Sequence, residues 1–187
     1  MSAVVTKGGR RLSCELAVVG VGVTPDTMLA RAAGLELGER GGIACSKTLE
    51  TSVPGIFAAG DVAEYESVVH GRPARVEHWD VAFQHGRTAA RNLLGEDVAH
   101  DVVPYFWSDM SDWASLEYVG VGGGQGVVRG SVDDGRFSVF YVDDGRLVGA
   151  LSVGRPEDLQ EARRMVADGA RPAADALADE DSDLAAL

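Results

Sequence analysis

The hydrophobic pattern of the first half of the chain predicts alternating strands and helices. A nearly continuous apolar run at 14–23, CELAVVGVGV, is typical of a parallel strand that is covered on both faces. Two shorter runs, GGIACS at 41–46 and GIFAAG at 55–60, are predicted to be further strands, with a turn at Val53-Pro54-Gly55 between them. Strands that alternate with helices indicate an α/β layer.

Two helices are predicted in the same half. Thr24, Pro25 and Asp26 form a start signal, so a short helix is expected over 25–33, ended by Gly34. A longer helix is expected over 76–94. Its apolar and small residues recur at helical spacing and predict one buried face, made of Trp79, Ala82, Phe83, Gly86, Ala89, Ala90, Leu93 and Leu94. The small residues would admit a neighbouring backbone or a flat ligand, and tight packing on a sheet explains the same spacing equally well.

The pattern changes near His100, where we place a domain boundary that gives units 1–100 and 101–187. Four strand-like runs follow, separated by a glycine-rich segment and by two Asp-Gly turns: SLEYVGV, GVVRGSV, RFSVFYV and RLVGALSV. Helices are predicted at 156–168 and 172–177, and the acidic end EDSDLAAL is expected to fray. The second unit is therefore expected to be α+β, a small antiparallel sheet with helices behind it.

Composition narrows the class of protein. The chain has 187 residues, 45% of them apolar, and 29 acidic against 17 basic side chains give a net charge of −12. This balance, without a basic cluster, argues against a nucleic-acid partner. No apolar run reaches the roughly 18 residues of a membrane span and no signal peptide is evident, so no membrane partner and a cytoplasmic location are expected. Cys14 and Cys45 form no metal or redox spacing and are predicted to be small buried residues.

The segment TSVPGIFAAGDVA at 51–63 carries the clearest chemical signal. A glycine, Gly60, and an acid, Asp61, follow a short apolar run. In open parallel sheets, ligands lie beyond the carboxyl ends of strands, where glycine admits close approach and an acid accepts hydrogen bonds from sugar hydroxyls. The same pair is common in ordinary turns, and that interpretation stays open on these residues alone.

The wider context resembles a known family. TSVPGIFAAGDVA, preceded by VVGVGVTPDTMLARAAGL and followed by VEHWDVAFQHGRTAARNLLG and VPYFWSD, resembles the FAD-dependent pyridine-nucleotide reductases that serve ferredoxins, a group that includes apoptosis-inducing-factor-like flavoproteins. The resemblance runs in order through nearly the whole chain. It implies a partial FAD-binding Rossmann-like layer followed by a smaller α+β reductase domain, with FAD as cofactor.

The resemblance also implies roles for single residues. Asp61 would hold the ribityl chain of FAD, with Gly60 providing close approach. Glu77, His78 and Trp79 would begin a helix whose first N–H groups face the flavin, a suitable place for the negative charge of a reduced flavin. A core position on the helix is a compatible interpretation of Trp79.

In the second unit, PYFWSDM matches the family segment that covers the flavin. Pro104, Trp107, Ser108 and Asp109 match the family pattern, whereas Tyr105 and Met110 depart from it. Trp107 is expected either near the flavin ring or between the two domains.

Other family segments are absent from the 187 residues. Neither of the family's glycine-rich GxGxxG turns is present, and GVGGGQG at 120–126 is predicted to be a hairpin loop. The chain therefore resembles the C-terminal half of a reductase that would pass a hydride from NAD(P)H to flavin and then electrons to ferredoxin or another acceptor. No catalytic residue and no metal site can be named. The alternative is a non-enzymatic association module, and a homodimer or association with the missing half is possible in either case.

Acceptor docking is expected on a basic region, because ferredoxins are usually acidic. Since this chain is itself acidic, we expect docking on the absent half or around Arg72, Arg75, Arg87 and Arg91.

Overall fold

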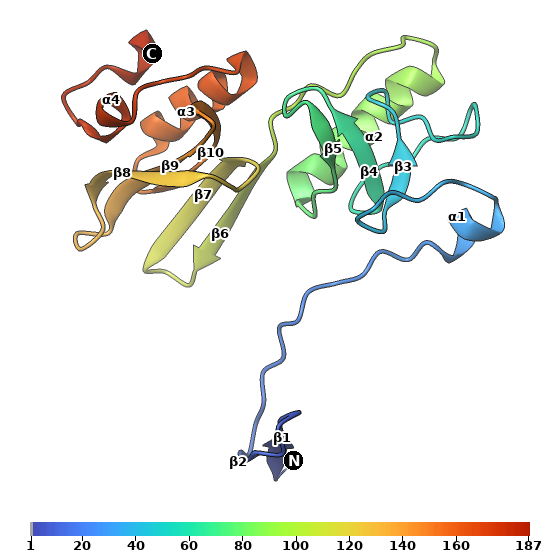
Figure 1. The fold of residues 1–187 in the computed structure, drawn as a ribbon, viewed down its shortest axis with the longest axis horizontal. Helices are drawn as coiled ribbons and strands as arrows, with labels where there is room; N and C mark the ends of the chain where they lie inside the picture. Colours follow the sequence, from blue (N-terminus) through green and yellow to red (C-terminus); the bar gives the residue numbers. More distant parts are fainter. Residues whose placement is uncertain (1) are drawn as a thin grey trace.

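A computed structural model describes residues 2–187 and shows three parts (Figure 1). The first is a small antiparallel hairpin of β1 (Ala3–Val5) and β2 (Arg11–Ser13). The second is a three-stranded sheet with a long helix, and the third is a five-stranded sheet with two helices. None of the helices in residues 2–187 combines the length and apolar character needed to cross a bilayer.

The predicted strand at 14–23 is wrong. This segment is extended and leads from the hairpin toward the second part (Figure 1), and no strand within residues 2–187 pairs with it. Its valines are exposed, up to 92% at Val18. A strand needs a hydrogen-bonded neighbour, and an apolar run reports only that burial would be favourable. Cys14 is half-buried rather than buried, so that prediction also fails.

The helix predicted over 25–33 is present but shorter. Helix α1 (Met28–Ala32) begins three residues later than expected, and the backbone N–H of Met28 donates to Asp26 Oδ1 at 3.0 Å. The turn at Gly34, which has φ +74°, follows its end as predicted.

The second part is a sheet of three short strands in the order β3-β4-β5. β3 (Ile43–Cys45) is parallel to β4 (Ala63–Ser67), and β5 (Arg72–Ala74) is antiparallel to β4. The predicted strand at 43–45 is confirmed, and Cys45 is buried as expected, which raises the pKa of its thiol to about 12. GIFAAG is not a strand, because only a single bridge links Phe57 to Glu50.

Helix α2 (Trp79–Leu93) forms close to its predicted range but buries a different face. Its buried residues are Val81, His85, Ala89 and Asn92, so of the predicted face only Ala89 is buried. The difference arises because two polar side chains lie on the buried face. Asn92 satisfies its amide by donating to the carbonyls of Thr48 and Val98 and accepting from the Val98 N–H, so its burial costs little.

The third part is an antiparallel sheet in the order β6-β7-β10-β9-β8. Its strands are β6 (Tyr105–Met110), β7 (Ala114–Gly120), β8 (Gln125–Ser131), β9 (Arg136–Asp143) and β10 (Arg146–Val153). The four predicted strands and their antiparallel arrangement are confirmed, whereas β6 was not predicted. The segment 121–124 is not a hairpin loop, because β7 and β8 are not neighbours in the sheet.

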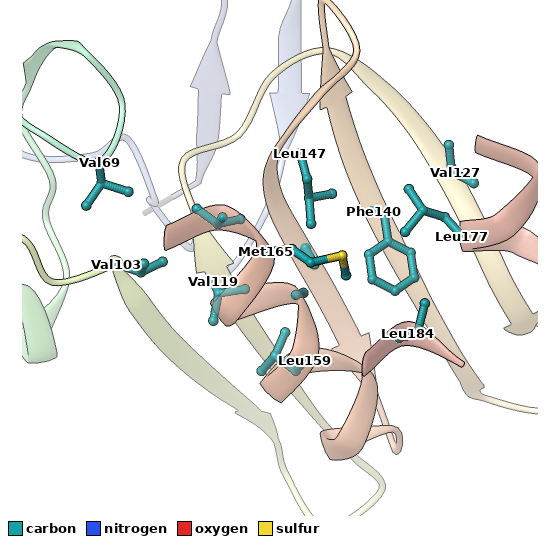
Figure 2. Close-up of a cluster of buried hydrophobic side chains, with 13 residues drawn as sticks. Val69, Val103, Val119, Val127, Phe140, Leu147, Leu159, Met165, Leu177 and Leu184 are labelled. Carbon is teal, nitrogen blue, oxygen red and sulfur yellow. The ribbon is translucent and has the colours of Figure 1, made fainter. Parts of the chain in front are cut away.

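Helices α3 (Pro156–Asp168) and α4 (Ala174–Ala178) lie on this sheet and cover a core that includes Phe140 and Met165 (Figure 2). The limits of α3 are those predicted, and α4 begins two residues late.

The prediction of a frayed tail is wrong. Leu184 is buried in the core of the third part and starts a short 3₁₀ helix, Leu184–Ala186. Arg129 donates to the carbonyls of Asp179, Glu180 and Ser182, which fixes the chain before it. The acidic composition of the segment predicted exposure, but burial of Leu184 fixes it to the core of the third part.

One side chain of the second part lies in the core of the third part. Val69, in the turn between β4 and β5, belongs to the hydrophobic cluster of Figure 2, and its carbonyl accepts from Arg146 Nη2 at 2.8 Å. This contact, with α2 packed near β6, holds the two sheets in a fixed relation and creates the cleft described below.

Candidate functional site

The Gly60–Asp61 turn lies before a strand rather than after one. β4 begins at Ala63, whose N–H donates to the carbonyl of Gly60 at 3.0 Å and closes the turn. Gly60 has φ +79°, a conformation that favours glycine. Asp61 is exposed, and none of the side-chain hydrogen bonds found among residues 2–187 involves its carboxylate. The turn therefore presents this carboxylate to solvent, but the placement at the carboxyl end of a strand was wrong.

Arg75 ties this turn to the start of α2. Its Nη1 donates to the Asp61 carbonyl at 3.3 Å and forms an ion pair with Glu77 Oε1 at 2.5 Å. The turn and the helix start, which are separated in sequence, are thereby brought together by one largely buried arginine side chain.

The first turn of α2 is open. His78 is the N-cap residue, with extended φ −113° and ψ 139°, and within the described part of the chain no side chain caps the helix start. The N–H groups of the first turn are therefore available to an acceptor, and the helix dipole favours negative charge there. This is the geometry that the family resemblance requires of Glu77, His78 and Trp79.

A cleft of about 600 Å³ opens between the start of α2 and strand β6. It is lined by Glu77, His78, Trp79, Asp80, Phe106 and Trp107. Trp79 is 70% exposed, so it is not a core aromatic, and its ring centroid lies 6.1 Å from that of Trp107 in an edge-to-face arrangement. The two tryptophans that the sequence singled out thus face the same cleft from different parts of the molecule.

The aromatic wall continues along β6. Tyr105, one of the departures from the family pattern, stacks on Trp107 with centroids 6.0 Å apart. Its hydroxyl donates to Glu117 at 2.7 Å, and burial together with this carboxylate raises the pKa of Tyr105 to about 12. Tyr105, held by this hydrogen bond, therefore helps to fix the orientation of the Trp107 ring in the cleft wall.

His78 shows that the cleft can accept a polar ligand. The ring packs against Phe106 at 4.6 Å, and its Nδ1 is buried without a partner among residues 2–187. Burial lowers the pKa of His78, opposed by Asp61, Asp80 and Glu77, so the ring is neutral near pH 7. An orphaned nitrogen and an uncapped helix start, beside a free carboxylate and exposed indoles, fit a flat aromatic group with polar edges and a polyol chain.

A second cleft, of about 720 Å³, adjoins the first and shares Glu77, His78 and Phe106 with it. Three arginines line it, Arg40, Arg72 and Arg75. Sequence reasoning missed Arg40 and Phe106. Arg40 lies in a turn with no motif, and Phe106 stands between two motif residues on a strand that was not predicted.

Comparisons with known proteins account for most of the chain. The family model described as pyridine nucleotide-disulphide oxidoreductase matches residues 1–86, and the model described as reductase C-terminal matches residues 105–187. The ferredoxin–NAD(+) reductase component of an anthranilate 1,2-dioxygenase system from Burkholderia cepacia is 42% identical over 168 residues, which is 88% of this chain and 41% of that protein. Putidaredoxin reductase from Pseudomonas putida is 34% identical over 90% of this chain and 40% of its own length.

Solved structures agree with these relatives. A ferredoxin reductase from Rhodopseudomonas palustris superposes with a TM-score of 0.89 at 39% identity, over 99% of this chain and 46% of that one. The reductase in a covalent putidaredoxin reductase–putidaredoxin complex gives 0.87 at 33% identity, over 98% and 44%. The chain spans about two-fifths of the length of the curated relatives it matches. By sequence motif, family match and fold, the chain joins a pyridine nucleotide-disulphide oxidoreductase segment to a reductase C-terminal domain, and the relatives and solved structures named above are ferredoxin reductases.

Proposed function

We propose that this chain forms one side of the flavin site of an FAD-dependent NAD(P)H:ferredoxin-type reductase. The observation that carries the proposal is the joining of the Asp61 turn and the open start of α2 by Arg75, at a cleft walled by Trp79 and Trp107. The proposal is supported by the lining of this cleft, which includes four of the residues that the sequence predicted for the cofactor: Glu77, His78, Trp79 and Trp107. No feature of residues 2–187 favours the alternative of a non-enzymatic association module.

Each group has a distinct task in this proposal. The Asp61 carboxylate accepts hydrogen bonds from the hydroxyls of the ribityl chain, and the left-handed turn at Gly60 lets the backbone come close. The first N–H groups of α2 orient the polar edge of the ring and stabilise negative charge there. Bound FAD would supply the chemistry, accepting a hydride and releasing single electrons.

The two tryptophans and His78 have the remaining tasks, which are to exclude water and to accept a hydrogen bond. Trp79 and Trp107 are exposed in this chain and would lose that exposure by covering the ring, which keeps water from the reacting face. His78 is neutral near pH 7, so its unpartnered Nδ1 can accept a hydrogen bond without adding a positive charge.

The acceptor is proposed to be a small iron–sulfur protein of the ferredoxin type. Two of the four arginines predicted for docking are already paired, Arg75 with Glu77 and Arg91 with Glu96 at 2.7 Å. Arg87 lies over the Phe83 ring at 6.0 Å, and Arg72 lines the second cleft with Arg40. Among the predicted set, Arg72 and Arg87 are therefore the better candidates for an acidic partner.

Three further expectations stay predictions. They are the domain boundary near His100, the cytoplasmic location, and association of the chain with a second copy or with a segment that carries the dinucleotide-phosphate turn.

The experiment is a flavin-fluorescence titration of this chain joined to the GxGxxG segment of a relative. Since no GxGxxG turn is present in the 187 residues to bind the pyrophosphate of FAD, we expect the chain alone to bind FAD weakly. A charge-assisted hydrogen bond is worth ~1.5–3 kcal/mol, so Asp61→Ala should weaken FAD binding by about 10- to 100-fold. Asp61→Asn should lose less, since an amide oxygen still accepts.

Asp133→Ala is the matched control, because Asp133 is also an exposed acid in a turn but lies in the third part, between β8 and β9. Equal dissociation constants for the parent, Asp61→Ala and Asp133→Ala would contradict the proposed role of Asp61.

A further inference from the structure

Behind the Gly60–Asp61 turn lies a buried cluster of three rings that the proposed function does not use. Tyr65 on β4, His85 on α2 and His100 after α2 are each 0–1% exposed. The His85 and His100 centroids are 4.4 Å apart, and Tyr65 lies 4.6 Å from His85 and 5.3 Å from His100, every pair edge-to-face. We call these three residues the ring cluster.

Among residues 2–187, one hydrogen bond links the ring cluster to the turn. The backbone N–H of Gly60 donates to Nδ1 of His85 at 3.2 Å. An imidazole nitrogen accepts only when it carries no proton, so this bond requires neutral His85 with its proton on Nε2. His100 does not share the contact, because its Nδ1 pairs with Thr88 Oγ1 at 3.1 Å.

We propose that His85 is a positioning residue for the cofactor turn, holding the Gly60 N–H from behind so that Asp61 is presented toward the cleft. The inference rests on the proposed function, because it gives the turn the flavin-binding role argued above. Gly60 has φ +79° and no side chain to restrict its backbone, so the His85 bond adds a restraint to those that Ala63 and Arg75 place on the carbonyls of the turn.

The surroundings keep His85 in the required state. Burial, followed by the neighbouring His100, lowers the pKa of His85 from 6.5 to about 3, and burial lowers that of His100 to about 4 against the opposing Asp101 and Asp80. Tyr65 is the other titratable group that faces the pair. Since the pKa in the folded chain lies below the ordinary value, His85 stays neutral from pH 8 down to about pH 5, and the bond persists over that range.

Nitrogen NMR of the chain itself tests the bond without any flavin. The Nδ1 and Nε2 shifts of His85 should show the Nε2–H tautomer, unchanged between pH 5 and 8. An Nδ1–H tautomer would overturn the proposal, even if no variant folds.

Two variants separate the acceptor from the shape of the ring. His85→Phe keeps an aromatic ring but no acceptor, and hydrogen exchange at the Gly60 amide should become about tenfold faster. His85→Asn places an oxygen near the Nδ1 position and should return exchange to within about threefold of the parent. His100→Phe is the control, because it alters the same cluster without touching Gly60. Equal acceleration in His100→Phe, or none in His85→Phe, would overturn the proposal.

The flavin titration described above distinguishes the two proposals. FAD binding should weaken about tenfold in His85→Phe and recover in His85→Asn. If Asp61→Ala weakens binding but His85→Phe does not, the positioning role fails and the proposed function stands. If Asp61→Ala has no effect while Gly60 exchange still depends on His85, the proposed function fails and the hydrogen bond remains a structural one.

Discussion

The contact that fixes the cleft can be tested by trimming Val69. Its side chain is 7% exposed and belongs to the core of the third part, although its backbone belongs to the second. Val69→Ala removes two carbon groups from this core, at about 0.8 kcal/mol each plus a cavity term, so the predicted loss is about 1.5–3 kcal/mol. The lost stability belongs to the junction between the two sheets. Among residues 2–187, Val69 is the one residue of the β4–β5 turn in that hydrophobic cluster.

The assay is urea unfolding followed by tryptophan fluorescence. Two of the three tryptophans, Trp79 and Trp107, line the cleft with ring centroids 6.1 Å apart, so part of the signal comes from it. With a typical slope of about 2 kcal/mol/M, the unfolding midpoint of Val69→Ala should fall by roughly 1 M. Val68→Ala is the matched control, since Val68 is the adjacent residue and is 45% exposed. If both variants shift the midpoint equally, Val69 does not join the two parts.

Two further changes follow from the charges of the structure. The Asp158 carboxylate is buried, accepts from Arg155 at 2.5 Å and from Ser138 at 2.9 Å, and lies 3.5 Å from Arg129. Asp158→Asn should therefore lower the free energy of unfolding by about 3–5 kcal/mol in chemical denaturation. A smaller decrease than that caused by Ser138→Ala would contradict this. Arg72→Glu should slow association with an acidic ferredoxin in stopped-flow at low salt, and the difference from the parent should shrink as salt rises; rates that do not depend on salt would refute docking at Arg72.

Local chemistry made the third part predictable from sequence. The Asp144-Gly145 turn has φ of 46° and 73°, the two positive values that a tight hairpin requires, and β9 and β10 pair directly across it. Pro156 at the first position of α3 and Gly169 in the left-handed conformation at its end gave the helix limits correctly. Each signal acts within a few residues, so no knowledge of the tertiary structure is needed to interpret it.

The second part was less predictable because its hydrophobic pattern does not report its neighbours. The apolar side of α2, with Trp79 and Leu93, is exposed, while His85 and Asn92 lie inside. Their burial depends on hydrogen-bond partners outside the helix, at Gly60, Thr48 and Val98, of which the first two are far away in sequence. A periodicity count treats such residues as polar and assigns them to solvent, so it selects the wrong face.

In the candidate site, too, some residues could be predicted from a sequence motif and others could not. The motif gave Asp61, Glu77 and Trp107, which would touch the cofactor, whereas the residues that hold them in place carry no motif. Arg75 fixes the front of the turn to Glu77, and His85 holds its back through the Gly60 N–H. Because a ligand gains affinity when its contacts are already in place, we expect these supporting side chains to contribute to binding through the residues that they hold. In the proposed site the Asp61 carboxylate is specific because its turn is held on both sides, by Arg75 directly after β5 and by His85 on α2.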